Sequence, residues 1–325
     1  MERVDFRQRI EPPSHRQILQ QEGYFIWCGS VVKDEKGMYH MFASRWSKEL
    51  GFKGWLTDSE IVRAVSRFPE GPYNIVEELG VLKRQAWCSK MVHNPMVLKY
   101  EDTYYLYYLG TTFREEEREE IYKNRMNPAR LSQRIGVARA PSPEGPWELC
   151  LENPVLEPRE GKWDSTFVTN PSVFAGEDKK IYMIYKSRLK EEERLNLGLA
   201  TAEQPFGAFC SVSDEPFFSY HVEDPYVWYE DGCYRMLAKA MSDELVENHN
   251  GILFESEDLK CWKLSEHPLA WDRFISWTDG VPERVPNMER PMLLLENGVP
   301  VCLYNAVGDF STWSYNLARR IMPKE

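Results

Sequence analysis

The sequence predicts an all-β fold, a single five-bladed β-propeller that spans residues 1–325. Three observations predict it. One hairpin pattern recurs five times along the chain, a second pair of strands follows each of the first four copies, and the last copy lacks its outer strand. A unit that recurs along a whole chain is typical of repeat architectures, and propellers repeat a four-stranded blade.

Each hairpin begins with a short apolar strand, usually led by a proline. A polar turn and a second strand rich in Tyr and Met follow, which is a hairpin pattern. The five copies occupy residues 27–45, 92–110, 168–188, 222–240 and 288–306. They align on Ser30, Pro95, Pro171, Pro225 and Pro291.

The outer half of each blade is a strand, a turn with Ser, Pro or Gly, and another strand, as in RIGVARAPSPEGPWELC. The predicted blades lie near residues 22–80, 88–150, 164–215, 220–268 and 285–322. Because the fifth blade has only WSYNLARRIMP, we expect residues 3–10 to supply its missing strand and close the ring. A β-sandwich or a two-domain β protein is the alternative. The charged segment 114–133 predicts a solvated helical insert in blade two.

Composition excludes several function classes. The net charge of −11 argues against nucleic acid or an anionic membrane as a partner, and no apolar run is long enough to span a bilayer. The seven cysteines are scattered without a CxxC pair, which predicts reduced, mostly buried thiols. The N-terminus has no apolar signal core, so a cytoplasmic protein is expected, or a periplasmic or secreted one if a signal preceded this sequence.

Polar residues recur where the first strand of each hairpin begins and where the second ends. In a propeller these places meet on one face, over the central channel. Acids paired across such a polar cavity are what glycosidic cleavage requires, while basic, amide and aromatic groups bind sugars. The candidate catalytic residues are Glu223, Asp224, Glu289 and Asp164. The candidate binding residues are His93, Asn94, Arg45, Asn170, Lys186, Arg188, Lys239, Arg290, Trp27 and Trp163.

The hairpins NPMVLKYEDTYYLYYLG and NPSVFAGEDKKIYMIYK, with the outer turns ARAPSPEGPW and SEDLKCW, resemble the five-bladed propeller glycosidases. These are glycoside hydrolase family 43 and its distant relatives, families 32, 68 and 117. The resemblance covers nearly the whole chain. It implies a propeller and a glycosidase activity. The long connections after each second strand would wall a pocket, which favours action on a terminal sugar of an oligosaccharide or polysaccharide fragment.

The resemblance also implies roles for particular residues. Glu223, two residues before Pro225, matches the family's general acid, and Glu289 has the same offset in blade five. The family's first-blade base is replaced by Cys28 or Gly29, and its middle-blade Asp by Asn94 and Asn170. Base, nucleophile or modulator would therefore fall to Asp224, Glu289 or Asp164.

These departures keep two alternatives open: a carbohydrate-binding propeller without catalysis, and a propeller-type glycoside phosphorylase. The phosphorylase would use the basic residues around phosphate. A carbohydrate is the expected partner, and nothing in the sequence predicts an oligomeric state. No cofactor or metal ligand is expected from the residues, since no DxDxDG-type motif occurs. Some relatives hold a calcium ion in the central channel, so the resemblance keeps a central calcium ion open as an expectation for this chain.

Overall fold

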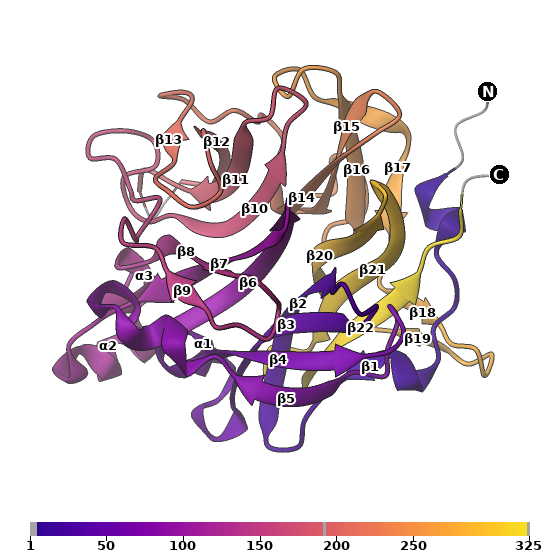
Figure 1. Ribbon diagram of the computed structural model, residues 1–325, viewed down its shortest axis with the longest axis horizontal. Helices are drawn as coiled ribbons and strands as arrows, with labels where there is room; N and C mark the ends of the chain where they lie inside the picture. Colours follow the sequence, from indigo (N-terminus) through magenta and orange to yellow (C-terminus); the bar gives the residue numbers. More distant parts are fainter. Residues whose placement is uncertain (1–4, 191–192, 324–325) are drawn as a thin grey trace.

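The computed structural model describes residues 5–190 and 193–323 and shows a five-bladed β-propeller (Figure 1). Five four-stranded antiparallel sheets surround one axis, and the innermost strand of each contacts the innermost strands of both adjacent blades. Within the described ranges, no helix is long and apolar enough to cross a bilayer.

The blades follow the predicted repeats. Blade one is formed by β2 (Tyr24–Lys33), β3 (Tyr39–Ser47), β4 (Glu60–Ser66) and β5 (Asn74–Glu78). Blade two is formed by β6 (Met91–Tyr100), β7 (Thr103–Thr111), β8 (Arg134–Ala140) and β9 (Glu148–Leu149). Blade three is formed by β10 (Thr169–Ala175), β11 (Ile181–Ser187), β12 (Asn196–Ala202) and β13 (Cys210–Ser211). Blade four is formed by β14 (Val222–Glu230), β15 (Cys233–Ala240), β16 (Gly251–Ser256) and β17 (Lys263–Trp271).

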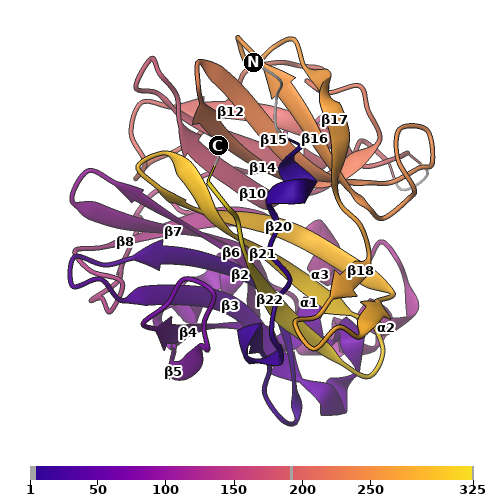
Figure 2. The same cartoon turned by 90° about the vertical axis from the view of Figure 1, so that its right-hand side faces the viewer.

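Blade five contains β20 (Asn287–Glu296), β21 (Val299–Gly308) and β22 (Ser314–Arg320), and its outer strand comes from the other end of the chain. That strand is β1 (Ile18–Leu19), which pairs with β22. Figure 2 shows the N-terminal segment running beside this blade. An additional hairpin, β18 (Phe274–Ser276) and β19 (Pro282–Arg284), leads into the blade.

The N-terminus therefore closes the ring, but the predicted closing range, residues 3–10, is wrong. Phe6–Arg9 is a 3-10 helix, and Ile10 makes a single bridge to Ile321. Pro12 and Pro13 have no N–H to donate to a ladder, so pairing resumes only after them, in β1. Residues 3 and 4 lie outside the described ranges.

The buried tyrosines of the second strands explain two of the sequence patterns together. Tyr107 donates from its hydroxyl to the carbonyl of Pro205 at 2.6 Å, and Tyr304 donates to that of Pro69 at 2.6 Å. Each acceptor lies in the proline-containing outer turn of the next blade around the ring. A buried phenol needs such a partner. The repeated Tyr and the repeated Pro turn thus hold adjacent blades together.

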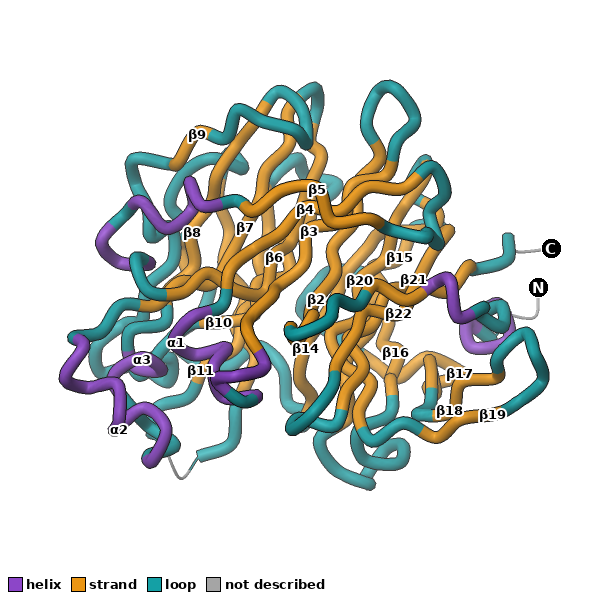
Figure 3. The backbone as a smooth tube through the Cα atoms, turned by 90° about the horizontal axis from the view of Figure 1, so that it is seen from below, coloured by secondary structure: helices purple, strands orange, loops and turns teal. Residues whose placement is uncertain are grey.

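Short helices cover one side of the channel face. The connection after β3 holds the 3-10 turns Lys48–Leu50 and Phe52–Gly54 and helix α1 (Trp55–Asp58). The connection after β7 holds a 3-10 turn at Glu115–Glu117, α2 (Arg118–Lys123) and α3 (Pro128–Leu131), which confirms a helical insert within 114–133. Figure 3 shows α1, α2 and α3 gathered together. The remaining 3-10 turns are His15–Gln17, Gly80–Arg84 and Ala86–Cys88.

Candidate active site

Every innermost strand carries the same irregularity at the same place. Its pairing with the second strand shifts across two residues, which is a β-bulge. In blades two to five the second bulge residue is the repeated proline, whereas in blade one it is Gly29, so Gly29 and not Ser30 occupies the proline position. The last paired residue before each bulge points one side chain per blade into a common cavity. These five residues are Trp27, His93, Thr169, Glu223 and Glu289.

The first bulge residue of each blade has a left-handed backbone conformation. The φ angles are 55° at Cys28, 50° at Asn94, 55° at Asn170, 56° at Asp224 and 52° at Arg290. A residue with a Cβ is strained there by about 1–2 kcal/mol, and such strain gathers at functional sites. The conformation turns these five side chains toward the axis, beneath the side chains of the five residues that precede the bulges.

The five side chains form a hydrogen-bonded chain around the axis, which we call the axial ring. Cys28 Sγ donates to Asn94 Oδ1 at 2.7 Å, Asn94 Nδ2 to Asn170 Oδ1 at 2.5 Å, and Asn170 Nδ2 to Asp224 Oδ1 at 2.7 Å. From the other side, Arg290 Nη1 donates to the same Asp224 oxygen at 3.2 Å. All donors therefore point toward the one carboxylate of the ring.

This placement keeps Asp224 ionised. Burial alone would raise the pKa of Asp224, but the Arg290 guanidinium, followed by Lys186, outweighs it and holds the pKa well below its usual range. Asp224 is 3% exposed and accepts two hydrogen bonds in the ring. It is a fixed anion on the floor of the cavity, and it is not placed to donate a proton.

Glu223 and Glu289 stand above the ring in neighbouring blades and share one cation. Lys239 Nζ lies 3.3 Å from Glu223 Oε2 and 2.6 Å from Glu289 Oε1. A second ammonium, on Lys186, lies 3.3 Å from Glu223 Oε2. Burial would raise the pKa of Glu223, but Lys186 and Lys239 outweigh it and lower the pKa. Burial would lower the pKa of Lys239, but Glu289 and Glu223 raise it overall.

The cavity above these groups has a volume of about 410 Å³ and an aromatic side. That side is formed by Trp27, Trp46, Phe52, Trp55 and Phe310. Trp46 is 1% exposed and supports the others, whereas Phe310 is 38% exposed. Sugar rings stack on such apolar faces, so the cavity combines a stacking surface with two carboxylates.

His93 lies between the aromatic side and the ring. Its Nδ1 is 2.8 Å from Ser59 Oγ, and its ring stacks on Trp55 with centroids 5.1 Å apart. Burial, and after it the Arg290 cation, lower the pKa of His93 to about 3. The imidazole is therefore neutral near pH 7, and it can hydrogen-bond a hydroxyl but does not supply charge.

The structure brings together most of the predicted site residues but not all. Nine of them line the cavity: Glu223, Asp224, Glu289, His93, Asn94, Asn170, Lys186, Arg290 and Trp27. Lys239 lies directly behind, through its contacts to both glutamates.

Four predicted residues lie elsewhere. Asp164 is 1% exposed and accepts from Arg159 Nε at 3.0 Å and from the Tyr185 hydroxyl at 2.7 Å. Trp163 is buried and stacks on Tyr185. Arg45 pairs with Glu60 and Glu78 in the outer part of blade one, and Arg188 is buried over the ring of Phe167. None of the four lines the cavity.

Sequence reasoning missed the two inserts as sources of site residues. Phe52, Lys53 and Trp55 come from the connection after β3, and Arg130 and Gln133 come from the end of the insert after β7. The segment 114–133 was expected to be solvated only, and its last residues instead turn into the cavity. The aromatic-rich GFKGWL at 51–56 was the available signal.

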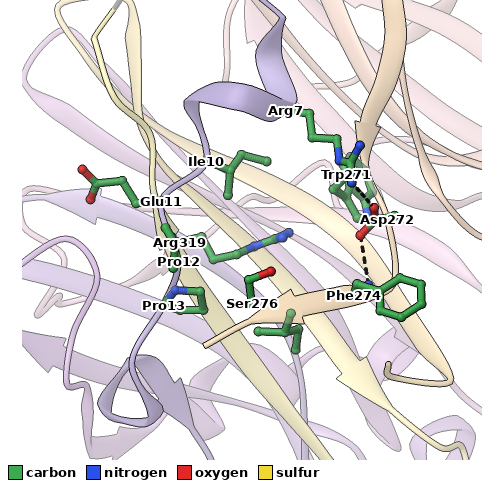
Figure 4. Close-up of a pocket in the computed structure, with 11 residues that line it drawn as sticks. Arg7, Ile10, Glu11, Pro12, Pro13, Trp271, Asp272, Phe274, Ser276 and Arg319 are labelled. Atoms are coloured by element: carbon green, nitrogen blue, oxygen red, sulfur yellow. Dashed lines mark hydrogen bonds and ion pairs between the residues drawn. The ribbon is translucent and has the colours of Figure 1, made fainter. Parts of the chain in front are cut away.

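Another cavity, of about 220 Å³, lies between the N-terminal segment and the last two blades (Figure 4). Arg7 pairs with Asp272 there, and Arg319 donates to Asn305 Oδ1 at 2.7 Å. No residue that lines this cavity precedes or belongs to a bulge of an innermost strand. It is separate from the axial ring, and Glu11 and Asp272 are its carboxylates.

The axial ring does not fit a calcium ion. Ca²⁺ takes about six to eight oxygen ligands. The ring offers one carboxylate, which already accepts from Arg290 and Asn170. Within residues 5–190 and 193–323, no group of three or more His, Cys, Asp or Glu side chains is arranged to hold a metal ion.

No protein-family model and no curated protein matches the sequence. Solved structures do match the fold. A family 117 glycoside hydrolase produced by the marine bacterium Zobellia galactanivorans has a TM-score of 0.67 and 15% identity, over 95% of this chain and 89% of that one. An endo-arabinase from Bacteroides thetaiotaomicron has a TM-score of 0.60 and 12% identity, over 97% and 99%.

A thermostable family-43 glycoside hydrolase is similar at a TM-score of 0.62 and 12% identity, over 93% of this chain and 91% of that one. These matches cover nearly whole chains, so the propeller is shared from end to end. At such identities they show the fold, and the chemistry must be argued from the site itself.

Proposed function

We propose that the protein is a glycoside hydrolase that removes a terminal sugar from an oligosaccharide or polysaccharide fragment, with Glu223 and Glu289 as its carboxylate pair. One observation carries the proposal. An oxygen of each glutamate lies within 3.3 Å of the same Lys239 nitrogen. These two oxygens are therefore no more than about 6 Å apart, an upper bound that includes the separation of about 5–5.5 Å used by retaining enzymes and lies below the roughly 6.5–9.5 Å of inverting ones.

The charges around each glutamate favour a division of roles. Glu223 contacts two ammonium groups and is kept ionised, which suits a nucleophile that attacks the anomeric carbon. Glu289 contacts one ammonium group, and we assign to it the transfer of a proton to the leaving oxygen. Water then attacks the glycosyl-enzyme ester while Glu289 takes its proton, which restores both groups. This assignment gives Glu223 a role different from the general acid that the family resemblance implied.

The shape of the cavity supports action at a chain end. The inserts after β3 and β7 wall one side, and the axial ring forms the floor. A volume of about 410 Å³ holds a small ligand rather than a long polymer. A terminal residue can stack on the aromatic side while its scissile bond lies near the two glutamates.

The test is sugar release from a panel of aryl glycosides and oligosaccharides by wild type, Glu223→Gln and Glu289→Gln, with Glu101→Gln as a control in an exposed turn. Each site variant should lose about 10²-fold or more in kcat at a temperature at which circular dichroism shows it to be folded, whereas the control keeps the wild-type rate. NMR of the first product should show retained anomeric configuration. Activity that survives in both site variants would refute the proposal.

A non-catalytic carbohydrate-binding protein is the second candidate, because one observation favours it. All three cavity carboxylates contact cations, whereas a resting general acid needs a raised pKa. That function predicts sugar binding without release by wild type. The phosphorylase alternative is weaker, because Lys186, Lys239 and Arg290 are already paired with carboxylates. It predicts release that depends on added phosphate.

A further inference from the structure

The cavity holds more positive than negative charge, although the chain carries a net charge of −11. Its three carboxylates are each paired with Lys186, Lys239 or Arg290. Two lining cations remain, Lys53 and Arg130. Lys53 donates to the Tyr122 carbonyl at 3.0 Å and Arg130 lies over aromatic rings, so within the described ranges neither has a carboxylate partner. The excess lies at one end of the cavity, on the two inserts.

Beside Arg130 lies a buried amide without a partner. Gln133 is 1% exposed, and neither its Nε2 nor its Oε1 hydrogen-bonds to any group in the described part of the chain. The Nε of Arg130 is likewise unpartnered. A buried polar group left unpaired costs about 1–3 kcal/mol. Two such groups at the wall of one cavity indicate a ligand that supplies the missing hydrogen bonds.

Arg130 is held in place by its own helix. The Asn127 side chain accepts from the backbone N–H of Arg130 at 3.0 Å, and Pro128 occupies the first turn, so α3 is firmly capped. The guanidinium lies 5.5 Å from the ring centre of Trp55 and 6.0 Å from that of Phe167. The planar cation is therefore oriented by aromatic faces and not by an anion of the protein.

The wall that carries Arg130 is itself rigid. Leu56, Phe113, Ile121 and Ala129 form a small apolar core between the two inserts. Around this core, Thr57 Oγ1 lies 2.8 Å from the Tyr122 hydroxyl, and Arg118 pairs with Asp58 at 2.8 Å. The unpaired groups are thus part of a preformed surface.

We propose that this end of the cavity recognises an anionic substituent of the sugar, a carboxylate such as that of a uronic acid. A guanidinium offers two parallel N–H donors to a carboxylate, and the Gln133 amide adds a third donor. A neutral hydroxyl would leave the Arg130 charge uncompensated. Burial, followed by the neighbouring Arg188 and Arg125, lowers the pKa of Arg130 to about 10, with Glu223 opposing in part, so a bound anion would stabilise the charged guanidinium. The inference rests on the proposed function, since it names the substrate class of the same site.

The test is binding, measured by calorimetry, of uronic acids against their neutral sugar counterparts, with inorganic phosphate as a separate titrant. The proteins are wild type, Arg130→Gln and Arg125→Gln. Arg125 is exposed on the same insert and does not line the cavity, so its variant removes an equal charge from the surface. Wild type should bind at least one uronic acid roughly tenfold or more tightly than the neutral sugar. Arg130→Gln should abolish that preference, with a larger loss of affinity for the uronic acid than for the neutral sugar, while Arg125→Gln retains it.

Three results would overturn the inference: equal binding of acid and neutral sugars by wild type, equal losses in both variants, or phosphate binding at Arg130 with no preference among sugars. An ester sulfate on the sugar shares the chemistry and is tested as an additional titrant. A preference lost only in Arg130→Gln supports the inference even when no sugar is released. Hydrolysis by the Glu223 and Glu289 pair is tested separately, so the two proposals fail independently.

Discussion

Lys239 Nζ lies 2.6 Å from Glu289 Oε1, and the same ammonium is the nearest shared neighbour of the two glutamates of the cavity. Lys239 is 3% exposed, so its charge is shielded from solvent and depends on the carboxylates. The pair joins blade four to blade five above the axial ring. It is therefore both a structural contact and the electrostatic centre of the proposed site.

Removing this ammonium should destabilise the fold. Lys239→Met leaves Glu223 and Glu289 facing each other, and loss of one partner of a buried ion pair costs about 3–5 kcal/mol. Urea unfolding at pH 7 measures the loss. The double variant Lys239→Met/Glu289→Gln should recover part of it, because one uncompensated charge is gone. A control, Lys36→Met, removes an ammonium that is 78% exposed and should change little. If Lys239→Met unfolded like this control, the shared-cation account would be wrong.

The left-handed ring residues allow a comparison of glycine with alanine. At Asn170, φ is 55°, so Asn170→Ala keeps the strain and loses two ring hydrogen bonds, whereas Asn170→Gly loses only the bonds. The glycine variant should be more stable than the alanine variant by about 1 kcal/mol. Ser172 is a buried strand residue without a positive φ. There the alanine variant, Ser172→Ala, should be more stable than Ser172→Gly by about 0.5–1 kcal/mol. Denaturant midpoints of the four variants measure these two stability orders. The same order of glycine and alanine at both positions would contradict the strain argument.

Much of the candidate site could be predicted from the sequence, and the reason is local. A proline and a partner strand that contains Tyr lie within about twenty residues of each other in four of the five repeats, and the propeller then places all five repeats around one axis. The positions of Glu223, Asp224, Glu289 and His93 follow from that register. The closing strand was misplaced because two prolines at 12 and 13 move the pairing to Ile18–Leu19.

The remainder of the site depends on contacts between distant segments. Arg130 and Gln133 reach the cavity because the inserts after β3 and β7 pack against each other, and neither insert shows this in its own pattern. Asp164 illustrates the opposite error. It precedes β10 by a few residues, as a channel acid would, but Arg159 and Tyr185 bind its carboxylate within blade three.

The neutral histidine predicts how stability varies with pH. The folded pKa of His93 is lowered to about 3 by burial, against about 6.5 in an unfolded chain. Between these two values His93 is protonated in the unfolded chain but neutral in the folded protein. The free energy of unfolding therefore decreases as the pH falls from about 6.5 toward about 3. His93→Gln should reduce the slope of unfolding free energy between about pH 6 and pH 4 by up to about 1.4 kcal/mol per unit. His40, whose pKa burial also lowers, stays in both proteins, so a slope remains. Identical slopes in urea titrations of the two proteins would contradict the prediction.

The cysteines predict a thiol count that reports on the packing of the ring. Cys210 and Cys261 are exposed, whereas the other five are buried. Burial raises the pKa of the Cys28 thiol well above its usual range, and it raises that of Cys88 to about 12. Because the thiolate is the reactive form, a disulfide reagent at pH 8 should titrate the two exposed thiols quickly in the native protein, and all seven only in denaturant. In Asn94→Ala, the Cys28 thiol loses the acceptor that lies 2.7 Å away, and the axial ring is interrupted beside it. A third, slower native thiol should then appear, identified as Cys28 by its absence in Asn94→Ala/Cys28→Ser. If three or more thiols of the native wild-type protein reacted quickly, the cores of the blades would shield fewer than five cysteines, and the prediction would be wrong.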